Sequence, residues 1–226
     1  MLINKIRSYT SLAVNQTQTE LEMNPWFLTG FSDGEACFLI NIFKSSKPKA
    51  GWGARATFEL GLDQKDLLIL NRIKSYLGVG NITSKTNGSC VYSVQSVKDL
   101  AVIIDHFDKY PLITKKGADY FLFKMAVNLI KNKEHLTKEG LRKIVAIKAS
   151  INKGLSNTLK EIFPDVKPVP KPLIADQEIK DPNWISGFVT GEGCFFIDIR
   201  KSSAYKIGYV VQLKFQVTQI LEIKLY

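Results

Sequence analysis

Two segments of the chain share a pattern in which two glycines, four positions apart, are followed directly by a glutamate. They are residues 30–35 and 187–192, and they are offset by 157 positions. The same offset aligns their surroundings: Asn24-Pro25 with Asp181-Pro182, Cys37 with Cys194, Phe38 with Phe195, Ile40 with Ile197, and Lys44-Ser45-Ser46 with Lys201-Ser202-Ser203. We infer that the chain contains two copies of one structural unit.

Each copy of the pattern is expected to lie on a helix, because Asn-Pro and Asp-Pro pairs favour helix starts. Gly30 and Gly34 then share one helical face, and Gly187 and Gly191 share the matching face of the second helix. Faces without side chains let two helices touch backbone to backbone. We therefore expect these four glycines to form a helix interface, with the two following glutamates side by side at one end of it.

Glu35 and Glu192 are the residues at which chemistry is expected. Two carboxylates at the C-terminal ends of neighbouring helices repel each other and face the negative ends of the helix dipoles. A divalent cation such as Mg²⁺ removes this repulsion, since it prefers carboxylate and carbonyl oxygens and is completed by substrate phosphates. The alternative is a pair of solvated glutamates beside glycines that serve packing alone. Recurrence of the whole pattern favours the metal site.

Both copies resemble the motif of the LAGLIDADG homing endonucleases, in the single-chain form that carries two motifs. The likeness extends over about residues 24–219. It implies that Glu35 and Glu192, the last acidic residues of the two motifs, bind the catalytic metal. An earlier acidic residue of the motif is present as Asp33 but is replaced by Thr190 in the second copy. No chemistry is therefore assigned to Asp33.

The resemblance implies roles for four further groups. The carbonyl oxygens of Gly34 and Gly191 match positions at which the family adds a main-chain metal ligand. Lys116 matches a basic residue near the scissile phosphates, and Gln219 matches a glutamine that positions water. For Lys116 and Gln219 the alternative of an ordinary polar surface residue stays open.

The fold class that the resemblance implies is α+β: an αββαββα unit with an antiparallel, saddle-shaped sheet, followed by an incomplete second copy. Hydrophobic periodicity supports the first unit directly. The expected strands lie near residues 37–45, 54–62, 82–85 and 91–95, and the expected helices cover residues 66–77, a segment from 97 that stops before Pro111, and residues 116–131.

The chain divides into four predicted parts. Residues 1–23 form a disordered tail, residues 24–131 the first unit, residues 132–180 a linker with a helix and a proline-rich spacer, and residues 181–226 a truncated second unit. The linker phrases at 133–141 and 152–156 are similar to those of fungal mitochondrial members of the family, which predicts a mitochondrial location.

The second copy departs from the first after Gln219. Where the offset predicts a polar turn and a helix start, the sequence reads Ile220-Leu221-Glu222-Ile223. We expect two strands and two helices of this unit to be missing, as a premature stop, a frameshift, a misplaced exon boundary or a truncated gene model would produce.

Composition narrows the class of partner. The formal net charge is +10 and the isoelectric point about 9.4, which favours a nucleic acid over a membrane surface, although charge alone fits an ordinary basic protein equally well. Three cysteines without a C-x-x-C pair are typical of free thiols in a reducing compartment. Two histidines do not suggest a zinc site. Neither a membrane span nor a secretory signal is expected, and no small-molecule cofactor.

An antiparallel sheet with helices on one face can present its other face to the major groove of double-stranded DNA. Arg suits guanine, Asn and Gln suit adenine, and Lys suits phosphate. The candidate DNA-binding residues are Asn41, Arg55, Thr57 and Glu59 in the first unit and Arg200, Gln212, Lys214 and Gln216 in the second. The alternative is an ordinary solvated sheet face.

The sequence thus predicts an intron-encoded homing endonuclease that hydrolyses both strands of a long DNA site with Mg²⁺, monomeric in its complete two-motif form. The first alternative is a maturase that binds its host intron RNA. Because RNA binding does not require Glu35 and Glu192, their presence favours the nuclease. The second alternative is an inactive, truncated remnant of the endonuclease.

Overall fold

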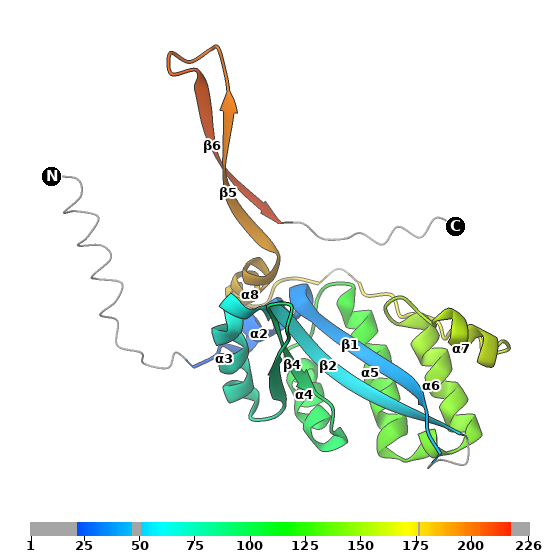
Figure 1. Ribbon diagram of the computed structural model, residues 1–226. Coiled ribbons are helices and arrows are strands. Elements are labelled where there is room, and N and C mark those ends of the chain that lie inside the picture. Colours follow the sequence, from blue (N-terminus) through cyan, green and yellow to red (C-terminus); the bar gives the residue numbers. More distant parts are fainter. Residues whose placement is uncertain (1–21, 47–50, 176, 218–226) are drawn as a thin grey trace.

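The computed structural model describes residues 22–46, 51–175 and 177–217. Within the first of the two predicted units the helices and strands follow the expected order (Figure 1). They are α2 (Pro25–Glu35), β1 (Ala36–Lys44), β2 (Trp52–Asp63), α3 (Leu67–Leu77), β3 (Asn81–Ser84), β4 (Ser89–Val94), α4 (Val97–Lys109) and α5 (Lys116–Lys131). The predicted αββαββα order is confirmed, and α5 follows it directly.

Local sequence accounts for the ends of these elements. Gly78 ends α3 in the left-handed conformation (φ 69°), which glycine adopts without strain. Ser96 caps α4 by accepting a hydrogen bond from the Asp99 backbone N–H at 3.0 Å. Asn87 and Gly88 form the turn between β3 and β4, with Gly88 at φ 81°.

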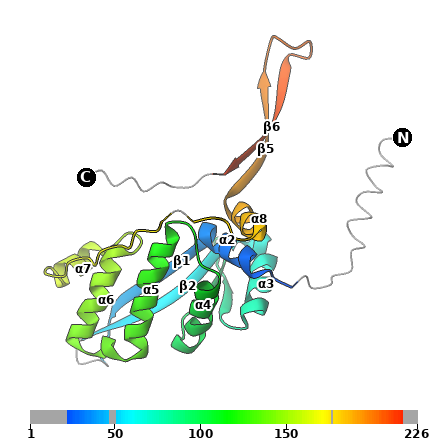
Figure 2. The same ribbon diagram turned by 180° about the vertical axis from the view of Figure 1, so that it is seen from behind.

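The four strands form one antiparallel sheet in the order β1-β2-β4-β3. In the register of β1 with β2, Phe38 lies opposite Phe58 and Ile40 opposite Ala56. These side chains point to the face that α4, α5 and α6 (Lys138–Ser150) cover, as seen from behind in Figure 2. The opposite face of the sheet carries no helix (Figure 1).

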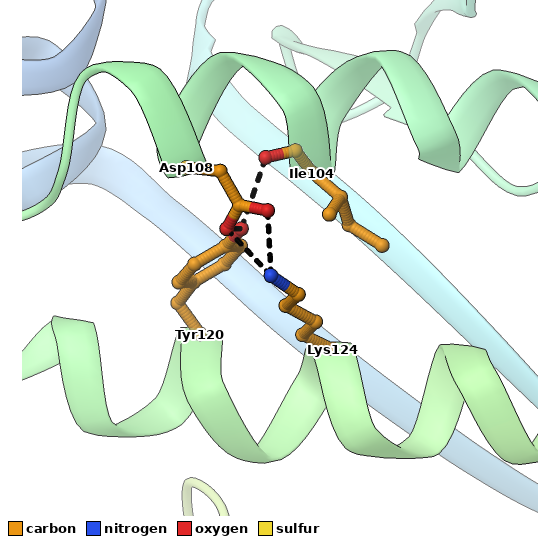
Figure 3. A network of polar contacts seen from close by, with 4 residues as sticks. All are labelled: Ile104, Asp108, Tyr120 and Lys124. Atoms are coloured by element: carbon orange, nitrogen blue, oxygen red, sulfur yellow. Dashed lines mark hydrogen bonds and ion pairs between the residues drawn. The ribbon is translucent and has the colours of Figure 1, made fainter.

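Helices α4 and α5 are joined by a polar network outside the core (Figure 3). The Tyr120 hydroxyl lies 3.0 Å from the Ile104 carbonyl oxygen and 2.7 Å from the Asp108 carboxylate. Lys124 adds an ion pair to Asp108. The network adds to the buried contacts of Leu122, Phe123 and Ala126 in holding α5, and the first residue of α5 is the candidate site residue Lys116.

The predicted linker contributes to the core of the first unit. A 3₁₀ turn (Glu134–Leu136) leads into α6, whose Ile144 and Ile147 are buried in that core. The proline-rich stretch has no regular structure but runs along α6, where the Val169 backbone N–H donates to the Ala146 carbonyl at 3.3 Å. A short helix, α7 (Asn157–Ile162), lies between them in sequence. Residues 132–180 are therefore more than a spacer.

The start of the first unit also differs from the expectation. Met23, assigned to the tail, is buried in the core with 7% of its surface exposed. The chain therefore enters the core one residue before Asn24. The remaining prediction of a disordered tail falls on residues 1–21, which lie outside the described residues.

The second unit, as described, consists of α8 (Pro182–Glu192) and an antiparallel hairpin of β5 (Gly193–Lys201) and β6 (Tyr209–Val217). The hairpin projects away from the first unit (Figure 1). Phe195 is 73% exposed, whereas its repeat equivalent Phe38 is 1% exposed. No described residue therefore covers the apolar face of the hairpin, whereas helices cover the equivalent face of the sheet in the first unit.

We predict that Ile147→Ala lowers the free energy of unfolding by about 2–5 kcal/mol, because it leaves a cavity in the core that α6 helps to form. Lys143→Ala, on the exposed side of the same helix, removes ion pairs at 3.7 Å and should cost less than about 1 kcal/mol. Urea unfolding followed by circular dichroism measures both. Equal effects would mean that α6 is not part of the core.

Candidate active site

Helices α2 and α8 begin in the same way. In α2 the Asn24 side chain accepts a hydrogen bond from the Trp26 backbone N–H at 2.8 Å, and in α8 Asp181 accepts one from Asn183 at 2.8 Å. A proline follows each cap, where its missing N–H costs nothing. Each helix is 11 residues long and ends on its glutamate, so the two copies present the same surface.

The first glycine of each helix lies against the backbone of the other helix. A Cβ atom on Gly30 would lie 1.9 Å from the Trp184 carbonyl oxygen, and one on Gly187 would lie 2.0 Å from the Phe27 carbonyl oxygen. No real Cβ atom is accommodated at such distances. The structure therefore brings the two helices together backbone to backbone at these glycines.

The second glycine of each helix lies beneath the glutamate of the other. A Cβ atom on Gly34 would lie 3.0 Å from Cγ of Glu192, and one on Gly191 would lie 3.1 Å from Cγ of Glu35. The two glutamate side chains thus cross the helix interface at the same end. Burial, and next the negative charge of Glu192, raise the pKa of Glu35 despite the opposing charge of Lys116.

Lys116 completes the charged group at this end. Its ammonium donates a hydrogen bond to the Gly34 carbonyl oxygen. Burial lowers the pKa of Lys116, although nearby carboxylates, including Asp33, Glu192 and Glu35, act in the opposite direction. The positively charged Lys116 ammonium is therefore held beside the two glutamates. It donates to the Gly34 carbonyl oxygen, which the family resemblance assigns to the metal.

An open cavity of about 540 Å³ gives access to Glu35. Its lining includes Asp63 and Asp66 near the start of α3, and Thr190 and Gly191 of α8. The expected water-positioning residue, Gln219, lies outside the described residues.

Asp33 is the residue that sequence analysis missed. It is 2% exposed, and its carboxylate accepts hydrogen bonds from the segment before α5 and from Trp184 of α8. The repeat comparison alone did not single this pair out, since Asp33 to Thr190 and Phe27 to Trp184 are two of six differences between the two eleven-residue helices.

Three of the four candidate DNA-binding residues of the first unit lie where DNA can reach them. Asn41 and Arg55 are exposed and directly opposite each other in the register, and Glu59 is partly exposed on the same face. The expectation that Thr57 is accessible to DNA is wrong, because Thr57 is buried with 1% of its surface exposed. It lies on the inner strand β2, opposite Leu39 of β1.

The candidates of the second unit lie on the polar face of the hairpin. The residues that share this face by register are Arg200, Gln212, Lys214 and Gln216, together with Asp198. The Asp198 carboxylate pairs with Lys214 and lies 3.1 Å from Nε of Arg200. The Arg200 guanidinium also donates to the Gln212 side-chain oxygen at 2.6 Å. Asp198 therefore organises the basic groups on this strand pair.

Residues 28–127 and 185–225 match the model of the LAGLIDADG endonuclease family. The chain belongs to the LAGLIDADG endonuclease family. The second match extends to residue 225, six residues past Gln219, the point at which we expected the likeness to end. The repeat-related glutamates, the glycine interface and the antiparallel sheet are thus the parts of a LAGLIDADG protein.

Several curated relatives come from fungi. "Probable intron-encoded endonuclease 3" of Neurospora crassa is 48% identical over 204 residues, which are 88% of this chain and 38% of that protein. "Probable intron-encoded endonuclease 2" of the same organism is 36% identical, covering 94% of this chain and 50% of that protein. The LAGLIDADG chain described here thus spans half or less of the length of these relatives.

Solved structures give the same family. The LAGLIDADG meganuclease I-CpaMI, bound to uncleaved DNA, is 48% identical with a TM-score of 0.84, and the match covers 86% of this chain and 67% of that one. I-SmaMI bound to cleaved DNA is 45% identical with a TM-score of 0.85, covering 87% and 66%. The described part of this LAGLIDADG chain includes no helix long and apolar enough to cross a membrane.

We predict that Gly30→Ala destabilises the docked pair of helices by about 1–3 kcal/mol or more, because its methyl group collides with the Trp184 carbonyl. A destabilising effect is informative, because a glycine-to-alanine change at an exposed position inside a helix increases helix stability. Fluorescence of Trp184, which is 7% exposed, should shift to longer wavelength on undocking. Gly61→Ala is the control, as its nearest neighbour would be 3.9 Å away. An unshifted spectrum would contradict the packing.

We predict that Glu35→Gln stabilises the metal-free protein at neutral pH. Because the folded-state pKa of Glu35 is raised, ionised Glu35 destabilises the fold above that pKa, and this effect disappears below the ordinary carboxyl pKa. The melting temperature of the variant, measured with a chelator, should exceed that of the parent at neutral pH and converge with it as the pH falls through the raised pKa. Glu161→Gln, on an exposed residue of α7, should leave it unchanged.

Proposed function

We propose that this protein is a site-specific endonuclease that cleaves both strands of a double-stranded DNA target with a divalent cation, Mg²⁺ in the cell. The observation that carries the proposal is the convergence of Glu35 and Glu192, each crossing over the second glycine of the opposite helix. Packing alone requires the glycines but not two carboxylates that raise the free energy of the pair.

The donor set fits such a cation. Glu35 and Glu192 would hold it, with the carbonyl oxygens of Gly34 and Gly191 as further ligands. When bound, the cation would polarise the scissile phosphate and lower the pKa of the attacking water. Lys116, which donates to the Gly34 carbonyl oxygen here, would give up that oxygen to the cation and neutralise charge beside the phosphate. Gln219 is proposed to orient the water, as the family resemblance implies.

The DNA would lie along the helix-free face of the sheet. Asn41, Arg55 and Glu59 offer base-edge contacts from adjacent strands of the first unit. The Arg55 guanidinium stacks 5.4 Å from the Phe43 ring centre, which holds its fork in one orientation. The net charge of +10 attracts the phosphate backbone at long range.

The second unit would contact the other half of the site. Its proposed contacts are Arg200, Gln212, Lys214 and Gln216. Asp198 pre-orients Arg200 and Lys214 and lowers their net charge, so phosphate binding by this hairpin competes with an internal ion pair.

Relatives support this proposal. I-CpaMI is described bound to uncleaved DNA, and I-SmaMI bound to cleaved DNA and to an uncleaved target with calcium ions. Another relative, 28% identical, is the "uncharacterized mitochondrial protein RF1" of Saccharomyces cerevisiae. We propose a mitochondrial location and a monomer, since α2 already finds its partner helix within the chain.

We predict that the purified chain, with Mg²⁺ and a randomised library of double-stranded DNA, produces a defined set of double-strand ends. Glu35→Gln and Glu192→Gln should each reduce cutting by at least ~100-fold, because each removes a ligand that supports several kcal/mol of transition-state stabilisation. Sequencing of captured ends measures both. Binding of a recovered target in Ca²⁺, measured by gel shift, should survive in the variants.

The matched control is Glu161→Gln, which makes the same change on an exposed residue of α7 and should cut normally. Absence of cutting by chain that is folded by circular dichroism would overturn the nuclease proposal. Binding of the host intron RNA in that case would identify a maturase, and binding of neither nucleic acid would identify an inactive protein.

A further inference from the structure

The interface between α2 and α8 is symmetric in its glycines but asymmetric in one polar pair. The Asp33 carboxylate accepts four hydrogen bonds: from the Ile113 N–H at 3.0 Å, the Thr114 N–H at 3.3 Å, the Thr114 hydroxyl at 2.6 Å and the Trp184 indole N–H at 2.9 Å. The first three come from the first unit itself. The fourth crosses the interface, and both of its partners are buried.

The repeat-related position holds no such pair. There Thr190 replaces Asp33 and Phe27 replaces Trp184, so neither a carboxylate nor an indole N–H is present. The Thr190 hydroxyl instead donates to the Ser186 carbonyl at 2.7 Å, within its own helix. The interface therefore holds one such hydrogen bond, with its acceptor, Asp33, on α2 and its donor, Trp184, on α8.

This asymmetry discriminates between possible partners. The glycine face of α2 closely resembles that of α8, so a second copy of the chain could present its α2 in place of α8. Phe27 would then lie against Asp33 twice, and each buried carboxylate would lose a donor. Leaving a buried charged acceptor short of a bond is costly. Only the pairing of α2 with α8 matches carboxylate to indole.

We propose that the Asp33–Trp184 hydrogen bond is a specificity element that selects α8 of the same chain as the partner of α2 and rejects the α2 of a second copy. Asp33 acts here as a positioning residue. Its other three bonds hold the segment before α5, where the Thr114 hydroxyl also accepts from the Lys116 backbone N–H at 3.2 Å. Correct pairing and placement of Lys116 thus depend on one carboxylate.

The test compares Trp184→Phe with Trp26→Phe in the full chain. Trp184→Phe gives α8 the residue that α2 has at Phe27 and removes the indole donor. Trp26→Phe makes the same change in α2, where the ring stacks edge-on against Tyr110 and away from Asp33. Molecular mass is measured by light scattering over a wide range of protein concentration. Opening of the helix pair is followed in every variant by hydrogen exchange of the α8 backbone N–H groups in NMR spectra, and in the parent and Trp26→Phe also by exchange of the Trp184 indole proton.

The parent and Trp26→Phe are expected to stay monomeric, with a protected Trp184 indole proton. Trp184→Phe should dimerise at concentrations where they do not, with its closed-to-open ratio lowered roughly tenfold. Asp33→Asn added to Trp184→Phe should dimerise more readily still, because it removes the buried carboxyl group whose missing donor opposes self-pairing of α2. If the bond only stabilised helix docking, the double variant would dimerise less readily than Trp184→Phe, because the second substitution would weaken both the α2–α8 pair and the α2–α2 pair.

Three outcomes would overturn the proposal: a parent chain that already dimerises, a Trp184→Phe variant that stays closed like Trp26→Phe, or one that opens without dimerising. The last would show that the bond stabilises docking without choosing the partner. None of these readouts is DNA cleavage, so the proposal stands or fails independently of the proposed nuclease activity.

Discussion

The close approach of α2 and α8 is the constraint on which the rest of the molecule depends. At Gly30 and Gly187 there is no room for a single methyl group, so each helix supplies the space that the other occupies. This contact is what places Glu35 and Glu192 beside each other at one end of the helix interface. The same contact attaches the second unit, because the hairpin that follows α8 stands away from the first unit (Figure 1).

At the candidate site the two carboxylates lower the stability of the helix pair that holds them. The carboxylates repel, and burial raises the pKa of Glu35 further, so the fold holds a group that would be more stable elsewhere. Lys116 relieves part of this conflict by placing a cation at the Gly34 carbonyl. Asp33 orders the segment that presents Lys116. Function and stability are therefore balanced within a small group of residues at one end of the interface.

The two units differ in how completely their sheets are covered. In the first, α4, α5 and α6 bury residues such as Phe38, and the opposite face carries no helix. In the second, the described residues leave the apolar side of the hairpin exposed, as Phe195 shows. The polar side is nevertheless organised by Asp198, so polar and apolar residues are separated onto opposite faces by the alternation of the strand.

The sequence by itself determined the repeat, the helix caps, the alternating strands and hence the family, because these depend on local spacing and residue type. It also determined that four glycines and two glutamates belong together. Only the tertiary structure decided that Thr57 is buried, that Met23 and α6 join the core, and that Asp33 bonds to Trp184. Those properties depend on which distant segments cover a residue, and burial and hydrogen bonds between positions 151 apart leave no local pattern to read.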